Sequence, residues 1–105
     1  MGTVVFTAEA APPGVVNLRI IGELDLAGRD GLTEALQEAL ARPGVHSVLV
    51  DLGPTTFIDS SAVGALVAGY RTAAQSGRRL RAINAGGSVL RVLTVTGVAA
   101  TLLDE

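Results

Sequence analysis

Hydrophobic residues recur along the chain with two periods, one typical of strands and one of helices. The runs TVVFTAE (residues 3–9) and VVNLRIIG (15–22) are rich in β-branched residues and flank the turn sequence APPG. So short a connection predicts an antiparallel hairpin, because a parallel pair needs a crossover of a dozen or more residues. HSVLVDL (46–52) is typical of a central strand, which we expect to lie parallel to residues 15–22. RLRAIN (79–84) alternates and predicts another strand.

Three other segments carry the period of a helix. The first has its apolar residues at helical spacing and ends before RPG: Leu32, Leu36, Ala39 and Leu40. The second runs from Ser61 to about Gln75 and contains Gly64 and Gly69, each of which costs about 1 kcal/mol relative to alanine. Close packing against the sheet or a partner should offset that cost. GGSVLRVLTVTG (86–97) predicts a short helix, and the final VAATLLDE (98–105) predicts a short edge strand.

The order of these elements is strand, strand, helix, strand, helix, strand, helix, with a last short strand. It predicts a single α/β domain over residues 1–105, with a mixed sheet of four to five strands and about three helices. With 49% apolar and 17% charged residues in 105, the chain can bury one core and is long enough for one domain.

Composition excludes several classes of function. The chain has no cysteine and one histidine, so thiolate zinc sites, cysteine catalysis and multi-histidine metal sites lack their ligands. We therefore expect no cofactor and no metal, and we place His46 at the start of a strand. A net charge of -2 and three aromatic residues give no reason to expect nucleic acid binding. No apolar run reaches the roughly 18 residues of a membrane span and no signal peptide is visible, so we expect a cytoplasmic protein.

The stretch TTFIDSSAVGALVAGY places Asp59, Ser60 and Ser61 where a strand gives way to a helix. A serine oxygen at that point can cap the helix by accepting a hydrogen bond from a backbone N–H, which is worth about 1 kcal/mol. The alternative is regulation by phosphate, because the free N–H groups and the dipole of a helix start hold an anion well. The two interpretations are compatible.

Two further segments could contribute to a site. GELD (residues 22–25) follows a strand, so Glu23 and Asp25 could reach the sheet edge where Ser60 lies; the simpler interpretation is that Asp25 caps the next turn. NAGGSVL places Ser88 near a helix start after two glycines, but it lacks the lysine of a P-loop and is weak support for phosphate binding.

The segments RIIGELDLAG, VLVDLGPTTFIDSSAVGAL and GGSVLRVLTVTGV together resemble the STAS domain of bacterial anti-sigma factor antagonists, over nearly the whole chain and in order. The resemblance implies that Ser60 is the residue phosphorylated by a partner anti-sigma factor with serine kinase activity. It also implies that Asp25 helps to contact that kinase, with Asp59 and Ser61 flanking the acceptor. The unmodified protein would bind the anti-sigma factor and free a sigma factor; phosphorylation would abolish binding and a phosphatase would reverse it.

The chain departs from the family pattern in two places. Ala62 stands where the family usually has glycine, close to the acceptor. The family generally continues through another strand into a C-terminal helix, which is absent from the expected elements here. An uncovered sheet edge or apolar face could then bind a partner or form a homodimer.

Two other functions compete with this switch. The same fold could be an unphosphorylated scaffold subunit of a stressosome or of a lipid-transport ABC complex, without kinase control. A small hydrolase with Ser60 as nucleophile has little support, because the single histidine lies far off in the chain, no G-x-S-x-G elbow is present and there is no lysine to act as base. We expect a binding protein and not an enzyme.

Overall fold

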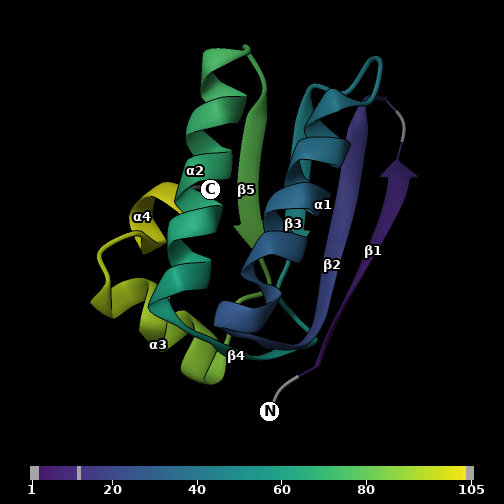
Figure 1. The fold of residues 1–105 in the computed structure, drawn as a ribbon. Helices are drawn as coiled ribbons and strands as arrows, with labels where there is room; N and C mark the ends of the chain where they lie inside the picture. Colours follow the sequence, from purple (N-terminus) through teal and green to yellow (C-terminus); the bar gives the residue numbers. More distant parts are fainter. Residues whose placement is uncertain (1–2, 12, 104–105) are drawn as a thin grey trace.

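A mixed sheet forms the centre of the computed structural model, which describes residues 3–11 and 13–103 (Figure 1). Its strands, within the described residues, are β1 (Val4–Ala11), β2 (Val15–Leu24), β3 (Ser47–Asp51), β4 (Thr55–Ile58) and β5 (Arg79–Ile83). β1 and β2 form the expected antiparallel hairpin, and β3 lies parallel to β2 and to β5. The order across the sheet is β1-β2-β3-β5, and β4 pairs with β2. The predicted single α/β domain with a mixed sheet is confirmed.

β4 is the strand that the sequence pattern did not predict. It continues the line of β3 along the same side of β2, so that residues 15–19 of β2 pair with β3 and residues 22–24 pair with β4. Two threonine hydroxyls attach β4 to β2: Thr55 Oγ1 donates to the carbonyl of Ile20 at 2.6 Å, and Thr56 Oγ1 to that of Gly22 at 3.2 Å. A strand of four residues is too short to show a clear period of two.

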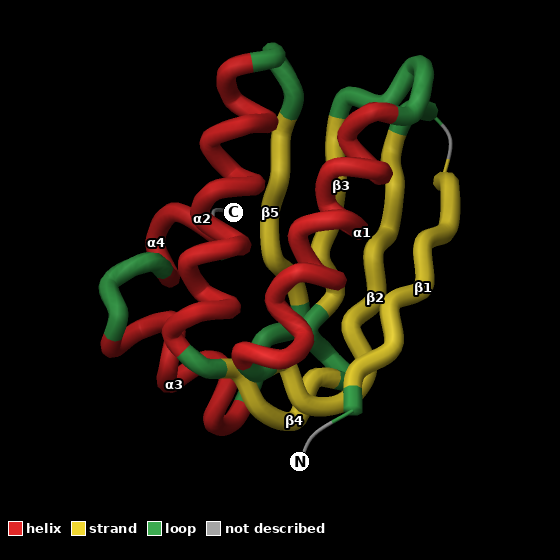
Figure 2. The backbone as a smooth tube through the Cα atoms, in the orientation of Figure 1, coloured by secondary structure: helices red, strands yellow, loops and turns green. Residues whose placement is uncertain are grey.

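The helices are η1, a short 3₁₀ helix (Leu26–Gly28), α1 (Arg29–Ala41), α2 (Ser60–Gln75), α3 (Gly87–Val95) and α4 (Ala99–Leu102). α1 and α2 lie side by side across one face of the sheet, while α3 packs near β4 and α4 near β5 (Figures 1 and 2). On β2 the residues facing the helices, Leu18 and Ile20, are buried, whereas Arg19 and Ile21, which alternate with them, are exposed. The helices therefore cover one face and leave the other open.

The prediction of an edge strand over residues 98–105 is wrong across its described part. Ala99–Leu102 form α4, a short helix that follows α3 directly. The reason is spacing: Val98, Ala99 and Leu102 pack into the core, whereas Ala100 and Thr101 are exposed, which fits the repeat of a helix and not the alternation of a strand. The further strand and C-terminal helix of the family pattern do not occur among the described residues. Asp104 and Glu105 lie outside the described residues.

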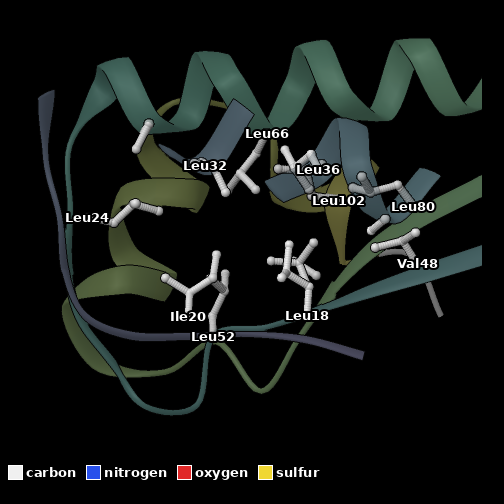
Figure 3. Close-up of a cluster of buried hydrophobic side chains, with 14 of the residues drawn as sticks. Leu18, Ile20, Leu24, Leu32, Leu36, Val48, Leu52, Leu66, Leu80 and Leu102 are labelled. Atoms are coloured by element: carbon white, nitrogen blue, oxygen red, sulfur yellow. The ribbon is translucent and has the colours of Figure 1, made fainter. Parts of the chain in front are cut away.

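A core of aliphatic side chains fills the space between the sheet and the helices. Figure 3 shows leucines from several elements converging there: Leu18 and Leu24 of β2, Leu32 and Leu36 of α1, Leu66 of α2, Leu80 of β5 and Leu102 of α4. All seven are buried. This core fixes the start of α2 relative to the end of β2, which is where the candidate residues lie.

Candidate functional site

Asp59 and Ser60 lie at the junction between β4 and α2. Ile58 ends β4 in register with Leu24, and the backbone N–H of Asp59 donates to the carbonyl of Leu24 at 3.2 Å. This bond holds Asp59 in an extended conformation (φ -111°, ψ 177°), and the helix begins at the next residue, Ser60. The sheet therefore sets both the position and the direction of the start of α2.

The N-cap of α2 is Asp59 and neither of the serines. Its carboxylate oxygen Oδ1 accepts hydrogen bonds from the backbone N–H of Ala62 at 3.0 Å and from the hydroxyl of Ser61 at 2.6 Å. The interpretation of a serine as the cap is thus corrected: Ser61 supports the cap indirectly, by donating to it. Aspartate and serine are equally good caps, so the sequence alone did not distinguish them.

The hydrogen bond from the Ser61 hydroxyl is also the largest influence on the acidity of Asp59. It lowers the pKa of the Asp59 carboxyl below its ordinary value of 3.8; desolvation opposes it, and the backbone N–H groups of Ala62, Ser61 and Leu26 lower the pKa further. Asp59 is therefore a carboxylate near neutral pH, beside the N-terminal end of a helix.

Ser60 is exposed at the first position of α2. Its hydroxyl makes no hydrogen bond to any residue that the structure describes, because Asp59 already supplies the cap. The hydroxyl is therefore available to an enzyme without breaking an existing contact.

Glu23 and Asp25 both lie at the end of β2 that pairs with β4: Glu23 is the second-last residue of the strand, which extends to Leu24, and Asp25 follows it. Asp25 follows Leu24, the partner of Ile58, and its carboxylate accepts from the backbone N–H of Gly28 at 3.3 Å. Asp25 is thus the N-cap of η1, as the simpler interpretation held. Glu23 is exposed and pairs in register with Phe57.

Two exposed apolar residues in this region were not predicted from the sequence. The exposed fraction of Leu26 is 62% and that of Phe57 is 45%, although both residue types are usually buried. Phe57 precedes Asp59 by two residues and Leu26 follows Asp25, so the acidic residues and these apolar side chains share one region. The sequence carried no clear signal for Phe57, because burial does not alternate along β4: Thr56 and Phe57 are both exposed between the buried Thr55 and Ile58.

The two glycines of α2 have different surroundings. A Cβ atom at Gly69 would lie 3.0 Å from Leu36 Cδ1 and 3.4 Å from Leu80 Cδ1, so this glycine allows α2 to approach α1 and β5. Gly64 is exposed, and a Cβ atom there would meet nothing within 4 Å. Packing against the sheet thus explains Gly69 only; Gly64 leaves a smooth surface one turn beyond Ser60, on the same side of the helix.

The other candidates lie apart from this edge or have simple structural roles. The Ser88 hydroxyl donates to the carbonyl of Thr56 at 3.4 Å, which links α3 to β4. His46 stands just before β3, as predicted, with its Nε2 atom 2.7 Å from the carbonyl oxygen of Pro13. Among residues 3–11 and 13–103 no three or more His, Cys, Asp or Glu side chains are placed to hold a metal ion. Within that part of the chain, no helix has the length and apolar character needed to cross a membrane.

A family model described as "Mlab, STAS domain" matches residues 7–104. The chain belongs to the STAS domain family. This STAS domain is 28% identical over 85 residues to the anti-sigma F factor antagonist of Paenibacillus polymyxa, which covers 81% of this chain and 73% of that protein. The resemblance stated from the sequence is confirmed at the level of the family.

Solved structures of anti-sigma factor antagonists share the fold of this STAS domain. An antagonist from Mycobacterium paratuberculosis superimposes with a TM-score of 0.83 at 21% identity, over 95% of this chain and 83% of that one. The unphosphorylated form of the antagonist SpoIIAA gives a TM-score of 0.78 at 23% identity, over 90% and 82%. The phosphorylated form of this Bacillus cell fate determinant gives 0.71 at 22%, over 90% and 86%.

Proposed function

We propose that this STAS domain is an anti-sigma factor antagonist whose binding to an anti-sigma factor is switched off by phosphorylation of Ser60. The observation that carries the proposal is the exposed Ser60 hydroxyl at the first position of α2, beside a cap that Asp59 already provides. The antagonist from Paenibacillus polymyxa supports the general role, and the two forms of SpoIIAA support the switch.

The surface around Ser60 is suited to bind a protein in the unmodified state. Leu26 and Phe57 offer exposed apolar area, and Glu23, Asp25 and Asp59 add acidic groups beside it. An apolar patch rimmed by charge is typical of a protein interface. The partner that fits this surface is an anti-sigma factor with serine kinase activity, whose active site must reach Ser60 while it contacts the rim.

Phosphorylation would change this surface through charge. A phosphate on Ser60 adds about -1.5 to -2 charges at neutral pH. The positive end of the α2 dipole favours that charge, whereas the Asp59 carboxylate opposes it. Because the Ser60 hydroxyl makes no hydrogen bond within residues 3–11 and 13–103, modification is expected to alter binding and leave folding nearly unchanged. A phosphatase would then restore the binding surface.

The position of the single histidine argues against a hydrolase with Ser60 as its nucleophile. His46 precedes β3, whereas Ser60 follows β4, which continues the line of β3 along β2 in the same direction. The two residues therefore lie toward opposite ends of the sheet, too far apart for a base to activate the hydroxyl. The scaffold alternative stays in competition with the switch, because α4 follows α3 with no strand between them and does not supply the C-terminal helix of the family pattern.

Phosphate mapping tests the proposal. The protein is incubated with the cognate anti-sigma kinase and ATP and is examined by intact-mass and peptide mass spectrometry. We expect one phosphate on Ser60, none on Ser60→Ala, and phosphorylation retained by the neighbouring control Ser61→Ala. Wild-type protein that is never modified, or Ser60→Ala that is modified as fully as wild type, would contradict the assignment.

Binding is measured separately by calorimetry with the anti-sigma factor. The unmodified protein should bind, and the phosphorylated protein should bind at least ten-fold more weakly, about 1.4 kcal/mol. Equal affinity of the two forms would rule out a phosphate-controlled switch even if Ser60 is the acceptor.

A further inference from the structure

β1 is the outermost strand of the sheet, and no described strand pairs with its outer edge. In Figures 1 and 2 it stands at the far side of β2 from β3 and β5. β1 has eight residues, long for an edge strand, and pairs with β2 over its full length without a bulge. β1 and β4 flank β2 on opposite sides, so this edge is separate from the Ser60 region.

The hydrogen-bonding pattern shows which backbone groups of β1 face outward. The N–H of Glu23 donates to the carbonyl of Thr3, and in an antiparallel pair every second residue along β1 repeats that inward direction. Val5, Thr7 and Glu9 therefore bond to β2. The residues between them direct their N–H and C=O groups away from the sheet: Val4, Phe6, Ala8 and Ala10.

This edge lacks the usual protection against strand pairing. Natural edge strands are blunted by proline, lysine, a bulge or inward-pointing charges. Between Val4 and Ala11 there is no proline and no basic residue, and Glu9 is the single charged side chain. We propose that a second copy of this chain pairs its β1 antiparallel with this one, centred on Thr7, to give a sheet continuous through both copies. The proposal does not depend on the function proposed for Ser60.

The two-fold arrangement centred on Thr7 uses the whole edge. It places Val4 opposite Ala10 of the second copy and Phe6 opposite Ala8, so the four outward residues of each strand meet in pairs. Each pair exchanges two backbone hydrogen bonds, about eight in all. Large side chains on the helix-facing side, Val4 and Phe6, also meet small ones, which is the complementarity that packing favours.

Other registers are less favourable. Centring the pair on Glu9 would set two carboxylates directly opposite each other, which is destabilising. Centring it on Ala8 would place Val4 opposite residue 12, a proline without an N–H to donate. Centring it on Phe6 leaves Ala10 without a partner inside the strand. In the Thr7 register Glu9 faces Val5 of the second copy, and the two Glu9 residues are about 14 Å apart.

Cysteine cross-linking tests both the pairing and its register, since the natural chain has no cysteine. In the proposed dimer Thr7 faces itself in a non-hydrogen-bonded pair, with Cα atoms about 4.5 Å apart, within the range that a disulfide spans. Under mild oxidation Thr7→Cys should form a covalent dimer at least ten-fold faster than the matched exposed control Glu9→Cys. Equal rates, or faster cross-linking of Glu9→Cys, would overturn the proposal.

Sedimentation measures the unmodified interaction. Edge pairing buries less area than a standard stable interface, so wild type should dimerise progressively between micromolar and millimolar concentration. Ala8→Pro removes an outward N–H without removing a bond to β2 and should abolish the dimer, whereas the control Ala8→Gly, which keeps the N–H, should retain it. Wild type that is monomeric at every concentration, or Ala8→Pro that dimerises as well as wild type, would overturn the proposal.

Discussion

Three adjacent residues at the start of α2 have different tasks. Asp59 caps the helix, Ser61 donates to Asp59, and Ser60 is left facing solvent. The location of this site could be predicted from the sequence, because a strand followed at once by a helix places the residues between them at a sheet edge. The division of tasks could not, since Asp and Ser have similar N-cap preferences and the bond from Asp59 to Leu24 decides which residue stands at the cap.

The depressed pKa of Asp59 predicts how stability depends on pH. The folded protein binds this proton more weakly than the unfolded chain, so Asp59 contributes stability above about pH 4, and the contribution is lost as pH falls through the folded pKa. Asp59→Asn keeps a capping oxygen but does not titrate. Urea unfolding between about pH 6 and pH 2 should show a smaller loss of stability in Asp59→Asn than in wild type. The same loss of stability with falling pH in both proteins would contradict the prediction.

The same pKa can be shifted through Ser61. Because the Ser61 hydroxyl is the largest influence on the Asp59 carboxyl, Ser61→Ala should raise the pKa of Asp59 toward its ordinary value. Carboxyl carbon chemical shifts followed by NMR through the acid range measure it directly. Ser60→Ala is the matched control and should leave the pKa unchanged. A similar rise in both variants would mean that the hydrogen bond from Ser61 is not the cause.

Within α2, the two glycines give opposite expectations for the same change. Gly64→Ala adds a methyl group in open space and removes the helix penalty of glycine, so the free energy of unfolding should rise by about 1 kcal/mol. Gly69→Ala has the same helix gain, but its methyl group meets Leu36 and Leu80, which are held in the core. Chemical denaturation should therefore give a higher free energy of unfolding for Gly64→Ala than for Gly69→Ala. Equal free energies for the two variants would contradict the prediction.

The elements that the sequence predicted well are those long enough to show their period. β2, α1 and α2 have ten or more residues, and their buried positions follow the expected spacing. β4 and α4 have four residues each, which is about one repeat, and they were missed or assigned to the wrong class. Their structure depends on tertiary contacts: hydroxyl bonds from Thr55 and Thr56 to β2, and the burial of Leu102.

For the molecule as a whole, α4 is short but closes the core. Leu102 is fully buried in the aliphatic core of Figure 3, and α4 packs against α3 and β5. Its neighbour Leu103 is only partly buried. Leu102→Ala should lower the free energy of unfolding by about 2–5 kcal/mol, and Leu103→Ala should cost clearly less. Thermal and urea unfolding measure both. Similar losses would mean that α4 is attached by its surface and not by its buried leucine.

β2 pairs with three other strands, with β1 along one side and with β3 and β4 in succession along the other. A local fluctuation cannot expose the backbone of β2, because β2 can separate from its neighbours only if its pairing with all three strands is broken. Its amide protons should accordingly exchange with deuterated solvent only when the entire molecule opens. The slowest exchange rates in this strand would then report the global opening equilibrium under fully native conditions, without any denaturant.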